Sequence, residues 1–275
     1  MRLPLSENLS LLHTSSAGEG KTKGMAKGLL LCHRGDLLAG ESAGFGLPVL
    51  KTENHTIFPS FYSLELFKSG TIEAVYHLNL INTWRVLGAD APPFFRSLME
   101  NIVRFYMSQP RLQSSGLKIR NVLFKILQIR STMKPGKSYG YCRVLYQAEG
   151  LQLKISVNGQ ALLHLGELIL LNEVPGRGFS RLINRTESSW NSLDGNNFLP
   201  WQRCAIQTAV ENPSLHIGFF LSVPESPNSH CFQVAAGREV GRELNWAGLS
   251  IAADQTVFTY HVNFYERSHM TEGHM

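Results

Sequence analysis

The chain has 275 residues, of which 43% are hydrophobic and 17% charged, so a packed core is expected and global disorder is excluded. Large all-β folds of this length often form one domain, so the sequence predicts one main domain. The formal charge of +5 comes from 26 Lys and Arg spread along the chain. Without a basic run or a nucleic-acid-binding motif, this charge does not predict a nucleic acid partner.

Residues 1–28 are polar, contain Gly and Lys and show no periodic apolar pattern. They are interpreted as a flexible N-terminal arm before a single domain over residues 29–265. The arm lacks the apolar centre of a signal peptide, and no segment reaches the roughly 20 apolar residues of a membrane span. These features predict a cytoplasmic protein without a membrane partner.

The first half of the chain predicts short strands and one helix. Residues 72–80 alternate apolar and polar side chains, which is the period of a half-buried strand. Pro92-Pro93 then opens the one main helix, over residues 93–108, where apolar side chains recur at helical spacing. Residues 117–129 fit either a buried strand or a second helix, and a strand is preferred.

From residue 133 onward the pattern is of short strands separated by turns. A turn is predicted at residues 133–136, and Asn158-Gly159 predicts a hairpin between strands 151–157 and 160–165. Residues 187–200 are expected to form a long polar loop, and residues 266–275 a C-terminal tail. More than a dozen strands with one helix predict a mainly β fold, a large antiparallel β-sandwich.

Residues 40–44 read Gly-Glu-Ser-Ala-Gly, which resembles the nucleophile elbow of carboxylesterases of the α/β-hydrolase family. The resemblance implies Ser42 as a nucleophile on a sharp strand-to-helix turn. However, Pro48 follows closely and would break the required helix, and strands do not alternate with helices along the chain. The other interpretation is a glycine-rich turn between two strands.

An arginine and tryptophan region offers the strongest candidate site. Three arginines spaced by four share a face and favour carboxylate, phosphate or sulfate groups. Aromatic rings beside Arg and Glu are typical of sugar sites, although solvated arginines and core tryptophans remain the alternative. The candidate substrate-binding residues are Glu173, Arg177, Arg181, Arg185, Trp190, Trp201, Arg238 and Trp246.

Residues 44–49 read Gly-Phe-Gly-Leu-Pro-Val. With the many strands and single helix, this stretch makes residues 29–265 resemble the large β-sandwich of galactose-mutarotase-like proteins. The resemblance implies a sugar-binding groove on one sheet, and epimerase or lyase chemistry in the family's enzymes, but it assigns no catalytic residue here.

The function expected from the sequence is therefore carbohydrate binding, with epimerase or lyase action on an acidic or phosphorylated sugar as its enzymatic form. The alternatives are a serine esterase that uses Ser42 and a non-catalytic binding or scaffold domain. The expected partner is a small-molecule or oligosaccharide ligand that includes anionic sugars. No cofactor and no metal are expected, and the four separated cysteines predict reduced core thiols.

Overall fold

The structure is a computed structural model of the chain. It describes residues 1–14, 24–38, 42–53, 55–68, 70–92, 125–159, 162–176, 178–184, 189–192, 199–205, 207–224, 232–238, 244–253 and 255–266, together with Phe95, Leu98, Asn101 and Val122. These residues form two antiparallel sheets. The small sheet has the order β1-β2-β3-β4, with β1 (Arg2–Pro4), β2 (Leu9–Leu12), β3 (Leu30–His33) and β4 (Asp36–Leu37).

The large sheet contains the other fifteen strands. Its first half in sequence comprises β5 (Phe45–Lys51), β6 (Thr56–Lys68), β7 (Thr71–Val86), β8 (Ala89–Asp90), β9 (Arg130–Glu149), β10 (Gln152–Asn158) and β11 (Glu167–Pro175). The rest are β12 (Arg181–Asn184), β13 (Ser189–Ser192), β14 (Leu199–Arg203), β15 (Thr208–Asn212), β16 (Ile217–Ser222), β17 (Phe232–Arg238), β18 (Leu244–Ala253) and β19 (Val257–Glu266).

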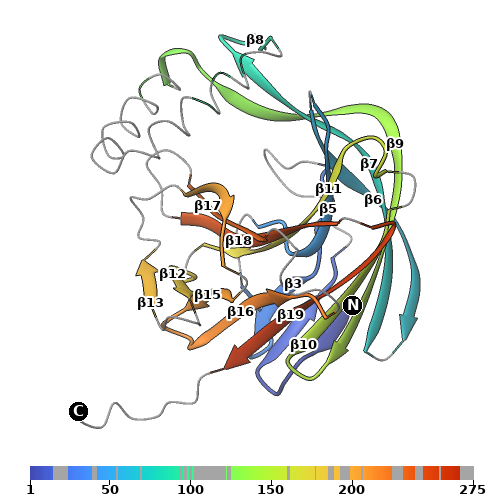
Figure 1. The fold of residues 1–275 in the computed structure, drawn as a ribbon, viewed down its shortest axis with the longest axis vertical. Helices are drawn as coiled ribbons and strands as arrows, with labels where there is room; N and C mark the ends of the chain where they lie inside the picture. The colour runs from blue at the N-terminus through green and yellow to red at the C-terminus, as the bar shows by residue number, and fades with distance from the viewer. Residues whose placement is uncertain are drawn as a thin grey trace.

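The spatial order is β13-β12-β15-β16-β19-β10-β9-β7-β6-β5-β11-β18-β17-β14, with β8 paired to β7. The sheet curls, so that β17 and β18 lie across the molecule from β6, β7 and β9 (Figure 1). Ring contacts show that it folds back on itself. Phe45 of β5 lies 5.0 Å from Phe219 of β16 and 5.1 Å from Phe264 of β19, between ring centroids. Because several strands separate β5 from β16 and β19 in the sheet order, these contacts join two layers, as in a β-sandwich.

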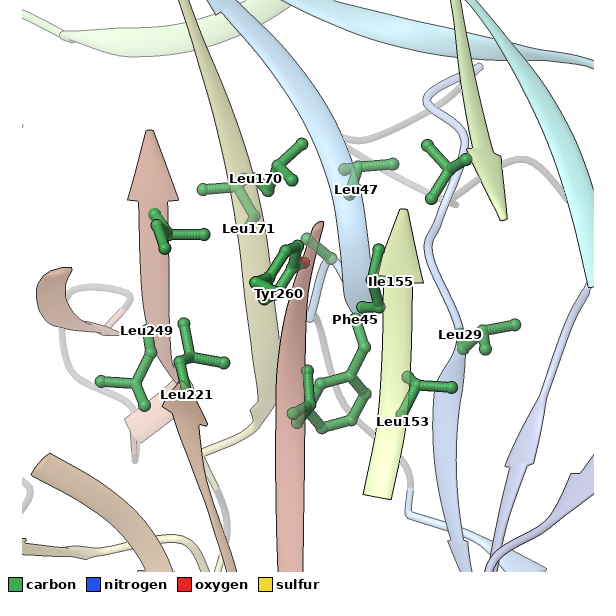
Figure 2. Close-up of a cluster of buried hydrophobic side chains, with 14 of the residues drawn as sticks. Leu29, Phe45, Leu47, Leu153, Ile155, Leu170, Leu171, Leu221, Leu249 and Tyr260 are labelled. Carbon is green, nitrogen blue, oxygen red and sulfur yellow. The ribbon is translucent and has the colours of Figure 1, made fainter. Parts of the chain in front are cut away.

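The core fills the space between these layers. Figure 2 shows Phe45 and Leu47 of β5 close to Ile155 of β10 and Tyr260 of β19. On β7, Val75 is buried, and so are the five alternating apolar side chains predicted to face the core: Ile72, Ala74, Tyr76, Leu78 and Leu80. Strands β5 and β11 are instead buried along nearly their whole length, because they lie in the middle of the packed layers.

The mainly β, antiparallel fold is therefore as predicted, but the predicted N-terminal arm differs. Residues 2–12 form β1 and β2 and continue the small sheet, and Leu3, Leu9 and Leu11 are buried in the core. A backbone bridge between Leu29 and Phe45 connects this sheet to the large one. The leucines of this segment are thus strand residues, although polar residues surround them in the sequence.

The single main helix is not confirmed. Of residues 93–108, only Phe95, Leu98 and Asn101 are described, and these three are helical. The strand preferred over residues 117–129 is wrong for Val122, Lys125 and Ile126, which are helical. Dense apolar residues fit both kinds of element, so periodicity could not decide between them.

The Asn158-Gly159 hairpin is also wrong. Strand β10 pairs with β9 and β19, and residues 162–165 form turns. The predicted turn at residues 133–136 lies inside β9, a strand of 20 residues. The predicted loop over residues 187–200 contains β13 and the start of β14. Local turn signals failed here because long-range pairing decided the register.

Candidate functional site

A buried polar network surrounds the segment between residues 42 and 46. The amide oxygen of Asn172 accepts hydrogen bonds from the Gly46 backbone N–H at 3.1 Å and from the Tyr260 hydroxyl at 3.0 Å. Its amide nitrogen donates to the Leu170 carbonyl at 3.3 Å. Asn172 is fully buried, so these bonds replace the water contacts it has lost.

Two further tyrosines extend this network across the layers. The hydroxyls of Tyr76 and Tyr146 lie 2.8 Å apart, and they also reach the carbonyls of Lys27 at 3.3 Å and Gly46 at 3.2 Å. Burial raises the pKa of both phenols, so they stay neutral. A side chain at Gly46 would lie 2.7 Å from the Tyr146 ring, and its φ of 72° also favours glycine. The interior is therefore tightly fitted at this segment.

Glu173 belongs to the same interior. Its carboxylate accepts a hydrogen bond from the Ala43 backbone N–H at 2.8 Å, and its own N–H donates to the Gly44 carbonyl at 3.0 Å. Burial raises the pKa of the Glu173 carboxyl to about 7, while the Ala43 hydrogen bond and the charge of Lys27 act in the opposite direction. Glu173 is only 8% exposed, so this geometry suits an internal structural role better than ligand contact.

Ser42 does not lie on a nucleophile elbow. The chain continues from Ser42 into strand β5 at Phe45, without the helix that the esterase resemblance requires. The Ser42 side chain is also buried. Gly40 and Glu41 of the predicted glycine-rich turn lie outside the described residues, and Gly44, just before β5, has a φ of 79°.

Arg181 takes part in a second internal contact. Its guanidinium donates to the buried carboxylate of Glu211 at 3.3 Å, and the Tyr265 hydroxyl donates to the same carboxylate at 2.9 Å. Glu211 is 1% exposed. A buried carboxylate held in this way is an ion pair that supports the fold between β12, β15 and β19.

The other predicted site residues are scattered. Arg177 and Arg185 lie outside the described residues, Trp190 lies in β13, Trp201 in β14 and Arg238 in β17. Trp246 of β18 is partly exposed and pairs with Pro175 and Gly237. Strands β18, β17 and β14 are neighbours at one edge of the large sheet, so Trp201, Arg238 and Trp246 lie on adjacent strands there. Glu173 bonds to Ala43 and Arg181 to Glu211, so the predicted cluster is only partly assembled in the described residues.

A different polar cluster lies on the outward-facing side of β7 and β9, and we call it the outer-face patch: His77, Asn79, Ser138 and Tyr141. The His77 Nε2 atom lies 2.8 Å from the Ser138 hydroxyl oxygen, and the Nδ1 atom lies 3.2 Å from the Asn79 amide nitrogen. The Tyr141 ring stacks on the His77 ring at 4.7 Å with an angle of 22°. Ser138 is exposed and Tyr141 is 48% exposed, so the patch faces solvent.

A bulge in β9 creates this patch. Leu78 pairs with Gly140 and Leu80 pairs with Pro135, so the single residue Asn79 faces four residues of β9, 136–139. Such bulges redirect side chains and are frequent beside functional sites. Here the bulge places the Ser138 hydroxyl beside the His77 ring, although the two residues are 61 positions apart in the chain.

Charged groups border the outer-face patch. Arg143 forms ion pairs with Glu65 and Glu73, the latter at 3.4 Å. Lys137, in the bulge itself, places its ammonium group 5.2 Å from the centre of the Tyr139 ring. The patch therefore combines an exposed aromatic ring with hydrogen-bonding groups, and Lys137 adjoins Ser138 in the chain.

Sequence reasoning missed all four patch residues. His77 alternates with the buried side chains of β7, which correctly places it on the other face, but this pattern is shared by many solvated residues. Ser138 follows Pro135-Gly136, which resembles an ordinary turn. No local signal indicated that β9 would bulge opposite Asn79.

Within the described ranges, no group of three or more His, Cys, Asp or Glu is arranged to hold a metal ion. In that same part of the chain, no helix has the length and apolar character needed to cross a membrane. The chain matches no protein-family model, no curated protein and no solved structure.

Proposed function

We propose that this protein is a carbohydrate-binding β-sandwich protein and that the outer-face patch is its sugar-binding surface. The observation that carries the proposal is the half-exposed Tyr141 ring, fixed by stacking on His77 and bordered by Ser138 and Asn79. Aromatic rings contact the apolar faces of sugars, and hydroxyl, imidazole and amide groups match sugar hydroxyls. Long strands hold all four groups, which lowers the entropic cost of binding.

An anionic sugar fits this surface best. Lys137 lies in the same bulge as Ser138, and no carboxylate partner is described for it within the structurally described chain. Its ammonium group would favour a uronic acid or a sugar phosphate over a neutral sugar. The arginines around Arg181 are a weaker alternative, because Arg181 already binds the buried Glu211.

Architecture and thiol chemistry support two further parts of the proposal. A large curled antiparallel sheet that folds into two layers suits the galactose-mutarotase-like class. Cys32 and Cys142 are buried free thiols, which favours a reducing compartment such as the cytoplasm.

A thermal-shift screen against neutral sugars, uronic acids and sugar phosphates tests this proposal. A ligand at 100 times its Kd adds about 2.7 kcal/mol, which should raise the Tm by about 5 °C or more. We expect the largest rise with anionic sugars and its loss in Tyr141→Ala.

Val257→Ala is the matched control, since Val257 is an exposed apolar residue on β19, 58% exposed and outside the patch. It should keep the full shift. Binding that survives Tyr141→Ala, or no shift with any sugar class, would contradict the proposal.

A further inference from the structure

Three side chains of the outer-face patch have the arrangement of a nucleophile, a base and a residue that orients the base. The Ser138 oxygen and the His77 Nε2 atom are 2.8 Å apart, which is within the range for direct proton transfer. Asn79 contacts the other ring nitrogen at 3.2 Å. Ser138 is exposed, so a substrate carbonyl could approach its oxygen.

The amide of Asn79 explains how the imidazole would be oriented. Its oxygen is buried and has no hydrogen-bond partner among the described residues, while its nitrogen faces His77 Nδ1. Rotation of the amide by half a turn places the oxygen opposite Nδ1, where it accepts the Nδ1–H bond. The lone pair of Nε2 then points at the Ser138 hydroxyl, which is the tautomer that a general base needs.

The bulge also supplies hydrogen-bond donors. Residues 136–139 fall outside the β7–β9 register, and β10 pairs with β9 only from Arg143 onward. Residues 136–139 therefore have no paired residue on β7 or on β10 in the described sheet. Backbone N–H groups beside a serine can stabilise the negative oxygen of a tetrahedral intermediate.

We propose that Ser138 and His77 form a catalytic pair that hydrolyses carboxylic esters, with Asn79 as the positioning residue. The substrate class is an O-acylated sugar, and this choice of alcohol rests on the proposed function, whereas the ester chemistry does not. The site is distinct from Ser42, which is buried and precedes a strand.

The reaction is balanced by one water. The Ser138 oxygen attacks the ester carbonyl carbon while its proton passes to His77 Nε2. The ester C–O bond breaks, and the sugar hydroxyl leaves with that proton. Water then attacks the acyl-serine and gives a proton to His77, and the departing Ser138 oxygen recovers it as the carboxylic acid is released.

Labelling with a fluorophosphonate, which reacts with activated serines, tests the pair independently of sugar binding. We expect one adduct on Ser138 in the full chain, found by peptide mass spectrometry, and none in Ser138→Ala. His77→Gln should slow labelling by about 100-fold or more, because the general base is lost. Ser156→Ala is the matched control: Ser156 bonds Thr259 at 3.0 Å rather than a histidine, and its loss should change nothing.

Steady-state hydrolysis of p-nitrophenyl acetate tests the role of Asn79. Asn79→Ala should lower kcat by about tenfold or more, and Asn79→Asp should restore it, since a carboxylate also accepts the Nδ1–H bond. If Asn79 had only a structural role, Asn79→Asp would not restore kcat selectively. No adduct on Ser138, or equal labelling in His77→Gln, would overturn the proposal.

Acetylated and deacetylated forms of one sugar separate the two proposals. Release of acetate from the sugar supports both. Labelling and p-nitrophenyl acetate hydrolysis without any sugar binding would overturn the carbohydrate proposal and support the ester chemistry. Sugar binding without labelling would support the carbohydrate proposal and overturn the ester chemistry.

Discussion

The buried network around Asn172 and the outer-face patch contain similar side chains but differ in burial and in hydrogen bonding. In the interior, Asn172 makes three hydrogen bonds and is fully buried. In the patch, the Asn79 oxygen is buried without a hydrogen-bond partner in the described chain, while Ser138 and Tyr141 face solvent. Full satisfaction in a buried site rigidifies a fold, whereas a buried polar atom without a partner calls for another role, such as catalysis. The comparison therefore separates a structural polar cluster from a candidate functional one.

The largest expected effect is in the interior, at Gly28. An added methyl group there would lie 2.1 Å from the Phe45 carbonyl oxygen, and backbone cannot move aside cheaply. We expect Gly28→Ala to cost about 3 kcal/mol or more in urea unfolding. Gly150→Ala is the control, because nothing lies within 4 Å of its added methyl group and only its φ of 58° is unfavourable. Equal losses in the two variants would contradict the tight interior.

The unfolding free energy of Glu173→Gln should depend less on pH than that of wild type. The pKa of about 7 in the folded state lies above the ordinary carboxyl value of 4.5, so the folded state holds the proton more tightly. Its stabilising contribution is complete below pH 4.5 and is lost as the pH rises through 7. Between pH 5 and pH 8.5, wild type should lose about 2 to 3 kcal/mol of stability relative to Glu173→Gln. Parallel pH curves from urea unfolding would exclude this role for Glu173.

His13 should show the opposite dependence. Burial, and then the N-terminal charge, lowers its pKa from 6.5 to about 4. Its contribution is complete above pH 6.5 and is lost as the pH falls through 4, because protonation favours the unfolded state. Hydrogen exchange should therefore show β1 and β2 opening first in acid, and His13→Gln should weaken that trend. Acid opening that begins elsewhere in the described sheets would count against it.

The smallest effect is expected beside the outer-face patch. Glu73 pairs with the half-exposed Arg143, and exposed ion pairs contribute little. Glu73→Gln should change the unfolding free energy by less than about 1 kcal/mol, and so should Ser138→Ala. Guanidinium or urea titration would check both variants. Losses as large as that of Gly28→Ala would mean that the patch is structural.

The candidate site could be predicted only in part. Glu173 and Arg181 are predicted to contact a sugar, but Glu173 is buried against Ala43 and Arg181 pairs with the buried Glu211. Burial of a charged residue depends on which strands pack over it, and the residues next to it in the sequence do not indicate this. The proximity of His77 and Ser138 likewise depends on the β7–β9 register and on one bulge.

The sequence by itself determined the fold class, because strand alternation is a local property with a period of two residues. The buried positions of β7 and of β10 follow directly from it. Only the tertiary structure decided that β5 pairs with β11, that the large sheet folds back so that Phe45 meets Phe264, and that the N-terminal residues join a sheet. These are contacts between distant parts of the chain, whose free energy depends on the burial of both partners together and not on either segment alone.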